Sequence, residues 1–433
     1  MIKPIDKEIL RIALPSIVAN ITVPLLGLID MSIAGHLGDV AYIGAMSVGA
    51  MMFNLVYWNF GFLRMGTSGL TAQAYGRKDE SGMRNVLAQS SVLALAIALA
   101  ILLLQYPLQW VSLKVISPSQ EVLHLAQLYF FVLVWGAPAI LLMMAIKGWF
   151  LGMQDSKSAM RISICVDVVN IVASLTAVYV LHMGFVGIAV GTLIAEYVAL
   201  AYGVVLLLSK HGGMLKQIRL SEAMRIGEMG RFMKVNADIF VRSFCLMLVS
   251  LSFVSIGARS GDMTLAVNSL IMQLFILYSY FMDGVAYAGE ALVGRYEGSQ
   301  DRAMLKKCVS HLFKWGSLVM VVYALCYGLL PGEIFSLLTD DEQVVVAALD
   351  YRWWCVSIPI AGMAAFVWDG VFIGETNTRG MLFSIAISGA VFFVISLIVP
   401  YPEGNTRLWL AFIAYLAVRS VVQTVLWLKK HST

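Results

Sequence analysis

The residues of this chain most able to do chemistry are ionisable side chains inside long apolar stretches. Asp30 lies in the run NITVPLLGLIDMSIAGHLG, six residues after Pro24. An ionisable group inside a membrane costs about 2.5–3.5 kcal/mol even on a permissive scale, so its presence needs a reason. Removal from water favours the neutral carboxyl, and Pro24 bends its helix and leaves a backbone carbonyl that can share a proton or ion. Asp30 is therefore either a group that exchanges protons near neutral pH or a structural carboxyl bonded to a neighbouring helix.

A second polar group lies in the apolar stretch 158–181. Asp167 and Asn170 are three residues apart, so on a helix they share one face. Thr192, in the next apolar stretch, can complete a polar pocket with them. The alternative is that Asp167 only caps a polar contact between helices.

The second half of the chain has its own ionisable residues in apolar surroundings. Arg242 lies about eleven residues inside one stretch and Asp283 about nine from the end of the next, so at 1.5 Å per residue their depths match. We predict a structural ion pair between them. Glu290 and Asp369 lie nearer the ends of their stretches. They are either residues of an inner gate or solvated residues at helix ends, and we expect solvated helix ends.

The sequence shows no motif for enzymatic catalysis, nucleotide binding or a metal centre. The chain has no HExxH, GxSxG or GxxxxGK[ST] motif, and its six histidines are scattered. Its five cysteines lack CxxC spacing and lie mostly in apolar runs, as buried thiols do. We therefore expect no enzyme, no ATP-driven pump, no cofactor and no metal centre of cysteine or histidine.

The elements that must position these residues are membrane spans. The chain of 433 residues is 60% hydrophobic and 13% charged, with a mean hydropathy of +0.83, and a soluble surface needs more charge than this. Apolar runs long enough to cross a hydrocarbon core of about 30 Å recur throughout. We predict an all-α membrane protein with twelve spans, near residues 8–34, 41–70, 86–112, 122–148, 158–181, 185–209, 232–257, 263–292, 306–331, 345–372, 380–400 and 406–428.

Most of the 30 lysine and arginine residues lie in alternate gaps between these spans. The opposite gaps hold little beyond Lys114, Arg259, Arg352 and Arg407. The positive-inside rule therefore places both termini in the cytoplasm. The first segment, MIKPIDKEIL, has no small-residue cleavage site, so we expect the first span to be retained. Because the basic residues lie in short loops, the net charge of +4 predicts no nucleic-acid partner.

The two halves of the chain repeat each other at a constant shift of 222 residues. KGWFLG (147–152) aligns with DGVFIG (369–374), and the same shift carries Gly76 onto Gly298. We therefore predict two six-helix bundles in parallel repeat, an N-terminal lobe (1–208) and a C-terminal lobe (232–433) joined by a linker (209–231). Such a repeat has its pseudo-two-fold axis along the membrane normal, so a central cavity can open to each side in turn, as in a transporter.

Several motifs together resemble one transporter family. They are ALPSIVANITVPLLGLIDMSIAGHLGD, FLRMGTSGLTAQAYGR, LHMGFVGIAVGTLIAEY, YFMDGVAYAGEALVG and WDGVFIGETNTR. The chain resembles the multidrug and toxic compound extrusion (MATE) family, in its DNA-damage-inducible DinF branch. The resemblance implies a V-shaped, two-lobed exporter of organic cations and other amphipathic compounds, driven by proton or sodium antiport. We expect a monomer in the bilayer of the cytoplasmic (inner) membrane, and 24 methionines with 11% aromatic residues suit a cavity for such substrates.

The resemblance also assigns roles to particular residues. It implies that Asp30 is the cation-binding carboxylate of the N-terminal lobe and that Asn170 and Thr192 belong to the same site. Pro15 matches the proline whose helix bends when that carboxylate is protonated. Relatives commonly have a second aspartate where this chain has Ser174. A Na⁺ site at Asp30 and Asn170 is therefore in doubt unless Asp167 substitutes, and we favour protons as the coupling ion.

Two other functions fit the same architecture. A flippase for lipid-linked precursors would need a strongly cationic central cavity, whereas we place only Arg242 deep in a span. A membrane receptor or scaffold without transport activity would not need matched charges in a two-fold repeat.

Overall fold

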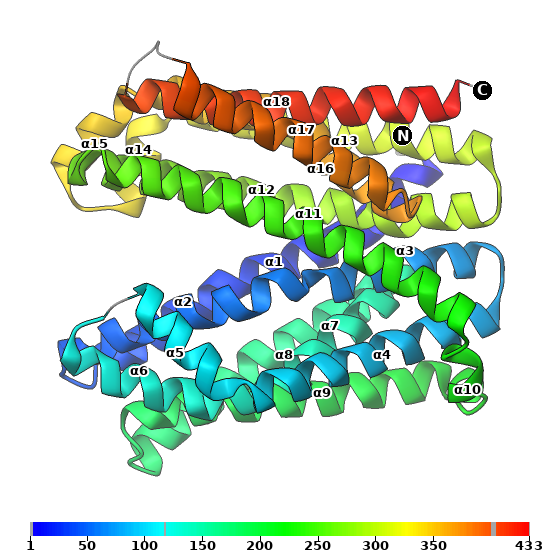
Figure 1. Cartoon of the computed structure of the whole chain (residues 1–433), viewed down its shortest axis with the longest axis horizontal. Coiled ribbons are helices and arrows are strands. Elements are labelled where there is room, and N and C mark those ends of the chain that lie inside the picture. The colour runs from blue at the N-terminus through cyan, green and yellow to red at the C-terminus, as the bar shows by residue number, and fades with distance from the viewer. Residues whose placement is uncertain (1–2, 117, 400–403, 433) are drawn as a thin grey trace. The chain divides into compact units, whose positions relative to one another are not determined.

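The computed structural model describes residues 3–116, 118–399 and 404–432, and in these ranges the regular structure is helical, with no strand (Figure 1). Twelve helical segments are long and apolar enough to cross a membrane, which confirms the predicted number. The spans are Pro4–Gly35, Ala41–Gly76, Glu80–Leu103, Gln120–Gly152, Ser156–Val180, Phe185–Leu215, Gly227–Ala258, Asp262–Gly298, Arg302–Leu329, Arg352–Gly374, Thr378–Ile398 and Gly404–His431. Residue 400, the predicted end of the eleventh span, lies outside the described residues.

Several spans are composite. In chain order the first elements are α1 (Pro4–Gly35), α2 (Val40–Tyr57), η1 (Trp58–Gly61), α3 (Phe62–Gly76), α4 (Glu80–Leu103), α5 (Gln105–Ile116), α6 (Gln120–Leu133), η2 (Val134–Gly136), α7 (Ala137–Gly152), α8 (Ser156–Leu175), η3 (Thr176–Val180), α9 (Phe185–Leu215) and α10 (Leu220–Ala223). The rest are α11 (Ile226–Ala258), α12 (Asp262–Gly298), α13 (Arg302–Leu329), α14 (Pro331–Leu338), α15 (Glu342–Leu349), α16 (Arg352–Gly374), α17 (Thr378–Phe393), η4 (Val394–Ile398) and α18 (Gly404–His431). The 3₁₀ turns η1 and η2 interrupt the second and fourth spans, and both contain glycine.

The chain forms two compact units. One is Leu14–Asn236, and the other combines Met1–Ala13 with Ala237–Thr433. The predicted lobe 1–208 therefore differs from the observed unit at its start. The first turns of α1 belong with the second unit because Asp6 lies 2.6 Å from Nδ1 of His311, and because Arg295 donates to the Glu8 carboxylate at 2.6 Å.

The predicted linker, residues 209–231, is largely helical. The helix α9 continues to Leu215, α10 follows, and α11 begins at Ile226. The amide of Gln89 on α4 donates a hydrogen bond to the carbonyl of Ala223 at 2.7 Å, and both residues are buried. The short helix α10 is therefore packed against α4 rather than free in solvent.

One turn geometry occurs four times. In each, a helix ends at a glycine, the second residue after it has a positive φ, and the third caps the next helix. The residues of positive φ are Lys78, Gln154, Gln300 and Thr376. The caps are Asp79, Asp155, Asp301 and Asn377. The N–H of each cap bonds to the carbonyl five residues earlier, as in a Schellman motif. The first two turns map onto the last two at the shift of 222 residues, so the sequence repeat is also a repeat of local structure.

Close helix contacts follow the same repeat. A Cβ added at Gly148 would lie 2.4 Å from the carbonyl oxygen of Arg64, and one added at Gly370 would lie 2.1 Å from that of Ala286. Glycine therefore lets α7 approach α3 in one unit and α16 approach α12 in the other. The residues just before these glycines are Lys147 and Asp369. Each close contact therefore also positions a charged side chain within the helix bundle.

Asp155, the cap of α8, has an ion pair in addition to its capping bonds. Its carboxylate accepts hydrogen bonds from the backbone N–H and the hydroxyl of Ser158, at 3.2 and 2.7 Å. It also lies 2.7 Å from Nζ of Lys210. Burial acts to raise the pKa of Asp155, but the bonds from Lys210 and Ser158 outweigh burial and hold the pKa below its ordinary value of 3.8.

Replacement of Asp155 by asparagine should cost stability in a pH-dependent way. Asp155→Asn keeps a capping side chain but loses the charge, so we expect a loss of about 1 kcal/mol at pH 7, reduced because Lys210 is partly exposed. Since the folded pKa lies below the unfolded one, this stability is present above about pH 4 and disappears as the pH falls through the folded value. Thermal unfolding in detergent should show a gap in Tm that narrows below pH 4.

The equivalent turn in the other unit supplies the control. Asp301 caps α13 by accepting a hydrogen bond from the N–H of Met304 at 2.9 Å. Asp301→Asn should change Tm less than Asp155→Asn does. Equal losses at the two positions would contradict the contribution of Lys210.

Candidate functional site

Asp30 lies in an apolar environment inside the unit Leu14–Asn236. Only 6% of its surface is exposed. Its neighbours along α1, Ile29 and Ile33, pack in a cluster that includes Tyr129 and Phe185. Tyr129 also interacts electrostatically with Asp30. This aspartate is therefore surrounded by rings and aliphatic side chains rather than by water.

Polar residues of α8 and α9 meet Asp30 on one side. A side-chain hydrogen bond joins Asp30 to Asn170, which is fully buried. The amide of Asn170 donates to the hydroxyl of Thr192 at 2.9 Å and accepts from the hydroxyl of Ser174 at 3.3 Å. The structure thus brings together Asp30, Asn170 and Thr192, and the remaining polar member of the group is Ser174.

The Asp30 carboxylate is incompletely satisfied. Among the described residues, its Oδ1 is buried and has no hydrogen-bond partner. A buried oxygen without a partner costs about 1–3 kcal/mol, and more when the group is charged. A proton or a small cation at Oδ1 would remove that cost. Ser174 contributes a hydroxyl and not a carboxylate, so Asp30 supplies the negative charge of this group.

Asp167 belongs to a different group of side chains. It interacts electrostatically with Lys147 on α7 and with Glu196 on α9. Its Oδ2 is buried and lacks a hydrogen-bond partner among the described residues. The ammonium of Lys147 donates to the hydroxyl of Ser163 at 3.2 Å. Sequence reasoning did not select Glu196, although a lone glutamate in the apolar run GTLIAEYVAL carries the same signal as Asp30.

The unit that contains Ala237–Thr433 has a buried ion cluster around Asp369. Its Oδ2 forms ion pairs with Arg242 of α11 and Arg419 of α18, and its Oδ1 accepts from the amide of Gln423 at 3.0 Å. The predicted partner of Arg242 was Asp283. In the structure the ion pair of Arg242 is with Asp369, and Asp283 adds an electrostatic interaction.

The prediction that Glu290 and Asp369 are solvated helix ends was wrong. Glu290 is 1% exposed, and the side chain of Asp369 is 13% exposed. The reason is that α12 continues to Gly298, two turns beyond Glu290, while α18 covers Asp369. Asp369 therefore has partners at both oxygens, whereas Asp30 has an open one.

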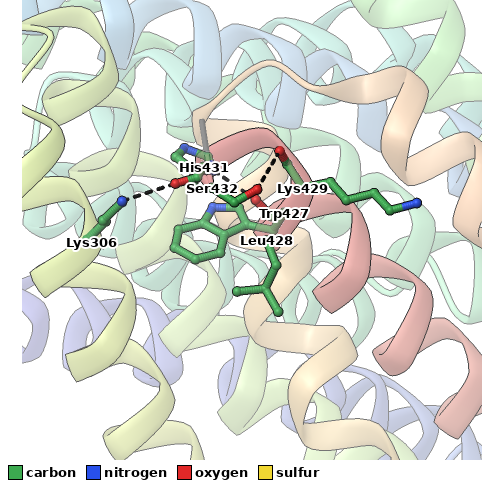
Figure 2. Close-up of a pocket in the computed structure, with 6 residues that line it drawn as sticks. All are labelled: Lys306, Trp427, Leu428, Lys429, His431 and Ser432. Carbon is green, nitrogen blue, oxygen red and sulfur yellow. Dashed lines mark hydrogen bonds between the residues drawn. The ribbon is translucent and has the colours of Figure 1, made fainter.

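A further polar group lies at the end of α18. The pocket there is lined by Lys306, Trp427, Leu428, Lys429, His431 and Ser432 (Figure 2). Glu297, Glu375 and His431 place possible metal-ligand atoms within 4.8 Å of one another. Lys430 lies 2.7 Å from the Glu375 carboxylate and 3.6 Å from that of Glu297. The indole of Trp427 also donates to the Glu375 carboxylate at 2.8 Å, so these contacts join the end of α18 to the residue that follows α16.

These features define a polytopic membrane protein of twelve spans with repeated halves and buried charges in each compact unit. The chain belongs to the MatE family, whose family model matches residues 15–176 and 239–400, one match in each half. This finding confirms the resemblance that the sequence motifs indicated.

Individual relatives agree with the family assignment. The chain is 35% identical to DNA damage-inducible protein F of Escherichia coli (strain K12), covering 98% of this chain and 92% of the relative. It is 24% identical to the chloroplastic protein DETOXIFICATION 44 of Arabidopsis thaliana, covering 96% and 81%. A solved multidrug resistance MATE family transporter in an outward-facing conformation has the same fold, with a TM-score of 0.89 at 19% identity over 98% of this chain and 96% of that one.

Proposed function

We propose that this protein is a secondary multidrug exporter that moves organic cations or other amphipathic compounds in exchange for protons. The observation that carries the proposal is the buried, unpartnered Oδ1 of Asp30 beside Asn170. Membership of the MatE family and the name of the solved relative support export of drugs as the task. The group has one carboxylate, Asp30, and the hydroxyl of Ser174 where relatives commonly have a second aspartate, which favours protons over Na⁺.

Alternating access explains how Asp30 couples the two movements. With the cavity open to the outside, Asp30 takes up a proton. The neutral carboxyl loses its interactions with polar partners, α1 shifts around Pro15 and Pro24, and substrate leaves. With the cavity open to the inside, Asp30 releases the proton and substrate binds. Per proton, a potential of 100 mV supplies about 2.3 kcal/mol and each pH unit about 1.4 kcal/mol, which sustains at least a tenfold gradient of a neutral substrate.

The proposed orientation has both termini in the cytoplasm and the protein in the cytoplasmic membrane as a monomer. The alternation of basic loops supports it. The four Schellman turns then lie on the cytoplasmic side, since each follows an even-numbered span. A flippase is disfavoured because the two arginines Arg242 and Arg419 are balanced by the carboxylate of Asp369 together with that of Asp283, which interacts with Arg242.

Purified protein in liposomes tests the coupling ion directly. We expect a fluorescent organic cation to accumulate when a pH gradient is imposed and the accumulation to collapse with a protonophore. A sodium gradient without a pH gradient should drive no accumulation, and a sodium ionophore should leave proton-driven transport unchanged. Transport that follows the sodium gradient alone would overturn proton coupling. No flux of any kind would favour a receptor or scaffold.

A further inference from the structure

The group formed by Glu196, Lys147 and Asp167 has no role in the coupling scheme above. All three residues lie within membrane spans, on α9, α7 and α8. Lys147 interacts electrostatically with both carboxylates, and the two carboxylates interact with each other. The hydroxyl of Tyr57, which also interacts with Glu196, is buried and has no hydrogen-bond partner among the described residues.

The composition of this group allows one carboxylate to become neutral. A buried charge without a partner is strongly destabilising, whereas a paired one is tolerated. The ammonium of Lys147 bonds to Ser163 and interacts at longer range with both carboxylates, so the charge of Asp167 still balances that of Lys147 when Glu196 takes a proton. A pair of one acid and one base could not titrate in this way without leaving a charge unpaired.

A cavity of about 170 Å³ lies beside Glu196 and extends to Thr192, the hydrogen-bond partner of Asn170 in the Asp30 group. Its walls include Tyr129 and Thr192, which contact the Asp30 group, together with Tyr57 and Glu196. Thr192 and Glu196 are four residues apart on α9, so they lie on one face, about 6 Å apart along the axis. The cavity is large enough for several water molecules. Most of its lining is apolar, and the side chains that can bond to those waters are Tyr57, Tyr129, Thr192 and Glu196.

We propose that Glu196 is a second proton-binding residue, which exchanges a proton with Asp30 through this cavity. The protonated carboxyl of Asp30 gives its proton to the first of a chain of water and hydroxyl groups, while the last of that chain gives one of its own protons to the carboxylate of Glu196. Asp30 becomes a carboxylate and Glu196 a neutral carboxyl. Only O–H bonds break and form, so the step is a proton transfer without oxidation or reduction. The inference rests on the proposed proton coupling at Asp30 and adds the route by which the proton leaves it.

The protonation of Glu196 depends on the charged and titratable groups around it. Those facing the relay are Lys147 on α7, Asp167 on α8, Tyr57 on α2 and, at the Asp30 end, Tyr129 on α6. Arg64 on α3 interacts with Lys147. In the proposed orientation Glu196 lies one turn of α9 closer to the cytoplasm than Thr192, so the relay carries the proton inward.

The test measures substrate transport driven by a pH gradient in liposomes. Glu196→Gln should slow transport about tenfold or more, because an amide cannot carry a proton, and should shift its pH profile. Substrate binding without a gradient should change less than about twofold. Glu196→Asp should recover most of the rate. An unchanged rate and pH profile in Glu196→Gln would overturn the relay.

A triple variant separates a relay from a structural charge cluster. If the group only balances charge, then Lys147→Met combined with Asp167→Asn and Glu196→Gln removes all three charges and should restore transport. A relay predicts that the triple variant stays slow. Tyr57→Phe, which removes the cavity hydroxyl and keeps all three charges, should slow transport a few-fold and supplies a result if the glutamine variant does not fold.

The Asp30 variant distinguishes this inference from the proposed function. If Asp30→Asn transports as the parent does, proton coupling at Asp30 fails whatever Glu196 does. If Asp30→Asn is inactive and Glu196→Gln is normal, the relay alone fails.

Discussion

Asp30→Asn should reduce transport driven by a pH gradient by at least about 100-fold, because the amide cannot take up or release a proton. The replacement has nearly the same size and can still form a hydrogen bond with Asn170. It also places a neutral group in the apolar surroundings of Asp30, which should preserve or raise stability. The expected defect is therefore in coupling and not in folding. The measurement is substrate accumulation in liposomes against an imposed pH gradient, with binding followed by fluorescence polarisation.

Asn170→Ala is the matched comparison for this prediction. It removes the amide partner but keeps the titratable carboxyl, so transport should persist at a rate lowered about tenfold. Asp30→Glu should retain part of the coupled rate. If Asp30→Asn accumulates substrate at the parent's rate, the mechanism proposed for α1 is wrong.

The spans and the repeat could be predicted from the sequence because lipid imposes simple rules. A helix needs about 20 apolar residues to cross the bilayer, and loops rich in lysine and arginine lie on the cytoplasmic side, so every second loop is basic. The repeat was visible because glycine is required where helices touch. Gly148 and Gly370 meet the backbone of α3 and α12, and no side chain larger than a hydrogen fits there without a shift.

The partners of the buried charges could not be predicted in the same way. Depth along a span can be counted, but the direction in which a side chain points and the helix beside it cannot. Arg419 and Gln423 come from α18, about fifty residues after Asp369 in the chain. Arg242 was placed at the right depth and given the wrong principal partner for this reason.

Burial of the helix ends was missed for a related reason. The prediction ended the eighth span at residue 292, where the apolar run stops, whereas α12 continues to Gly298. A helix can extend past its apolar run when its polar residues find partners in the protein, so Glu290 is covered where water was expected. Glu196, in contrast, could have been found by applying to α9 the rule that selected Asp30.

Gly370→Ala should destabilise the unit that contains it by about 3 kcal/mol, because its Cβ would meet backbone rather than a movable side chain. The new atom would lie 2.1 Å from the carbonyl oxygen of Ala286 and 2.7 Å from its Cα, so α16 and α12 must separate. That movement also displaces Asp369, the preceding residue, from Arg242 and Arg419. We expect a fall of several degrees in Tm in detergent and a loss of monodisperse protein.

Gly213→Ala is the control, since Gly213 is inside α9 and an added Cβ has nothing within 4 Å. There the change should be neutral or stabilising by less than about 1 kcal/mol, because alanine is the better helix former. Gly148→Ala, whose Cβ would lie 2.4 Å from the carbonyl of Arg64, should resemble Gly370→Ala and disturb Lys147 instead. A Gly370→Ala protein as stable as Gly213→Ala would mean that α12 and α16 separate at little cost, and that their close contact does not position Asp369.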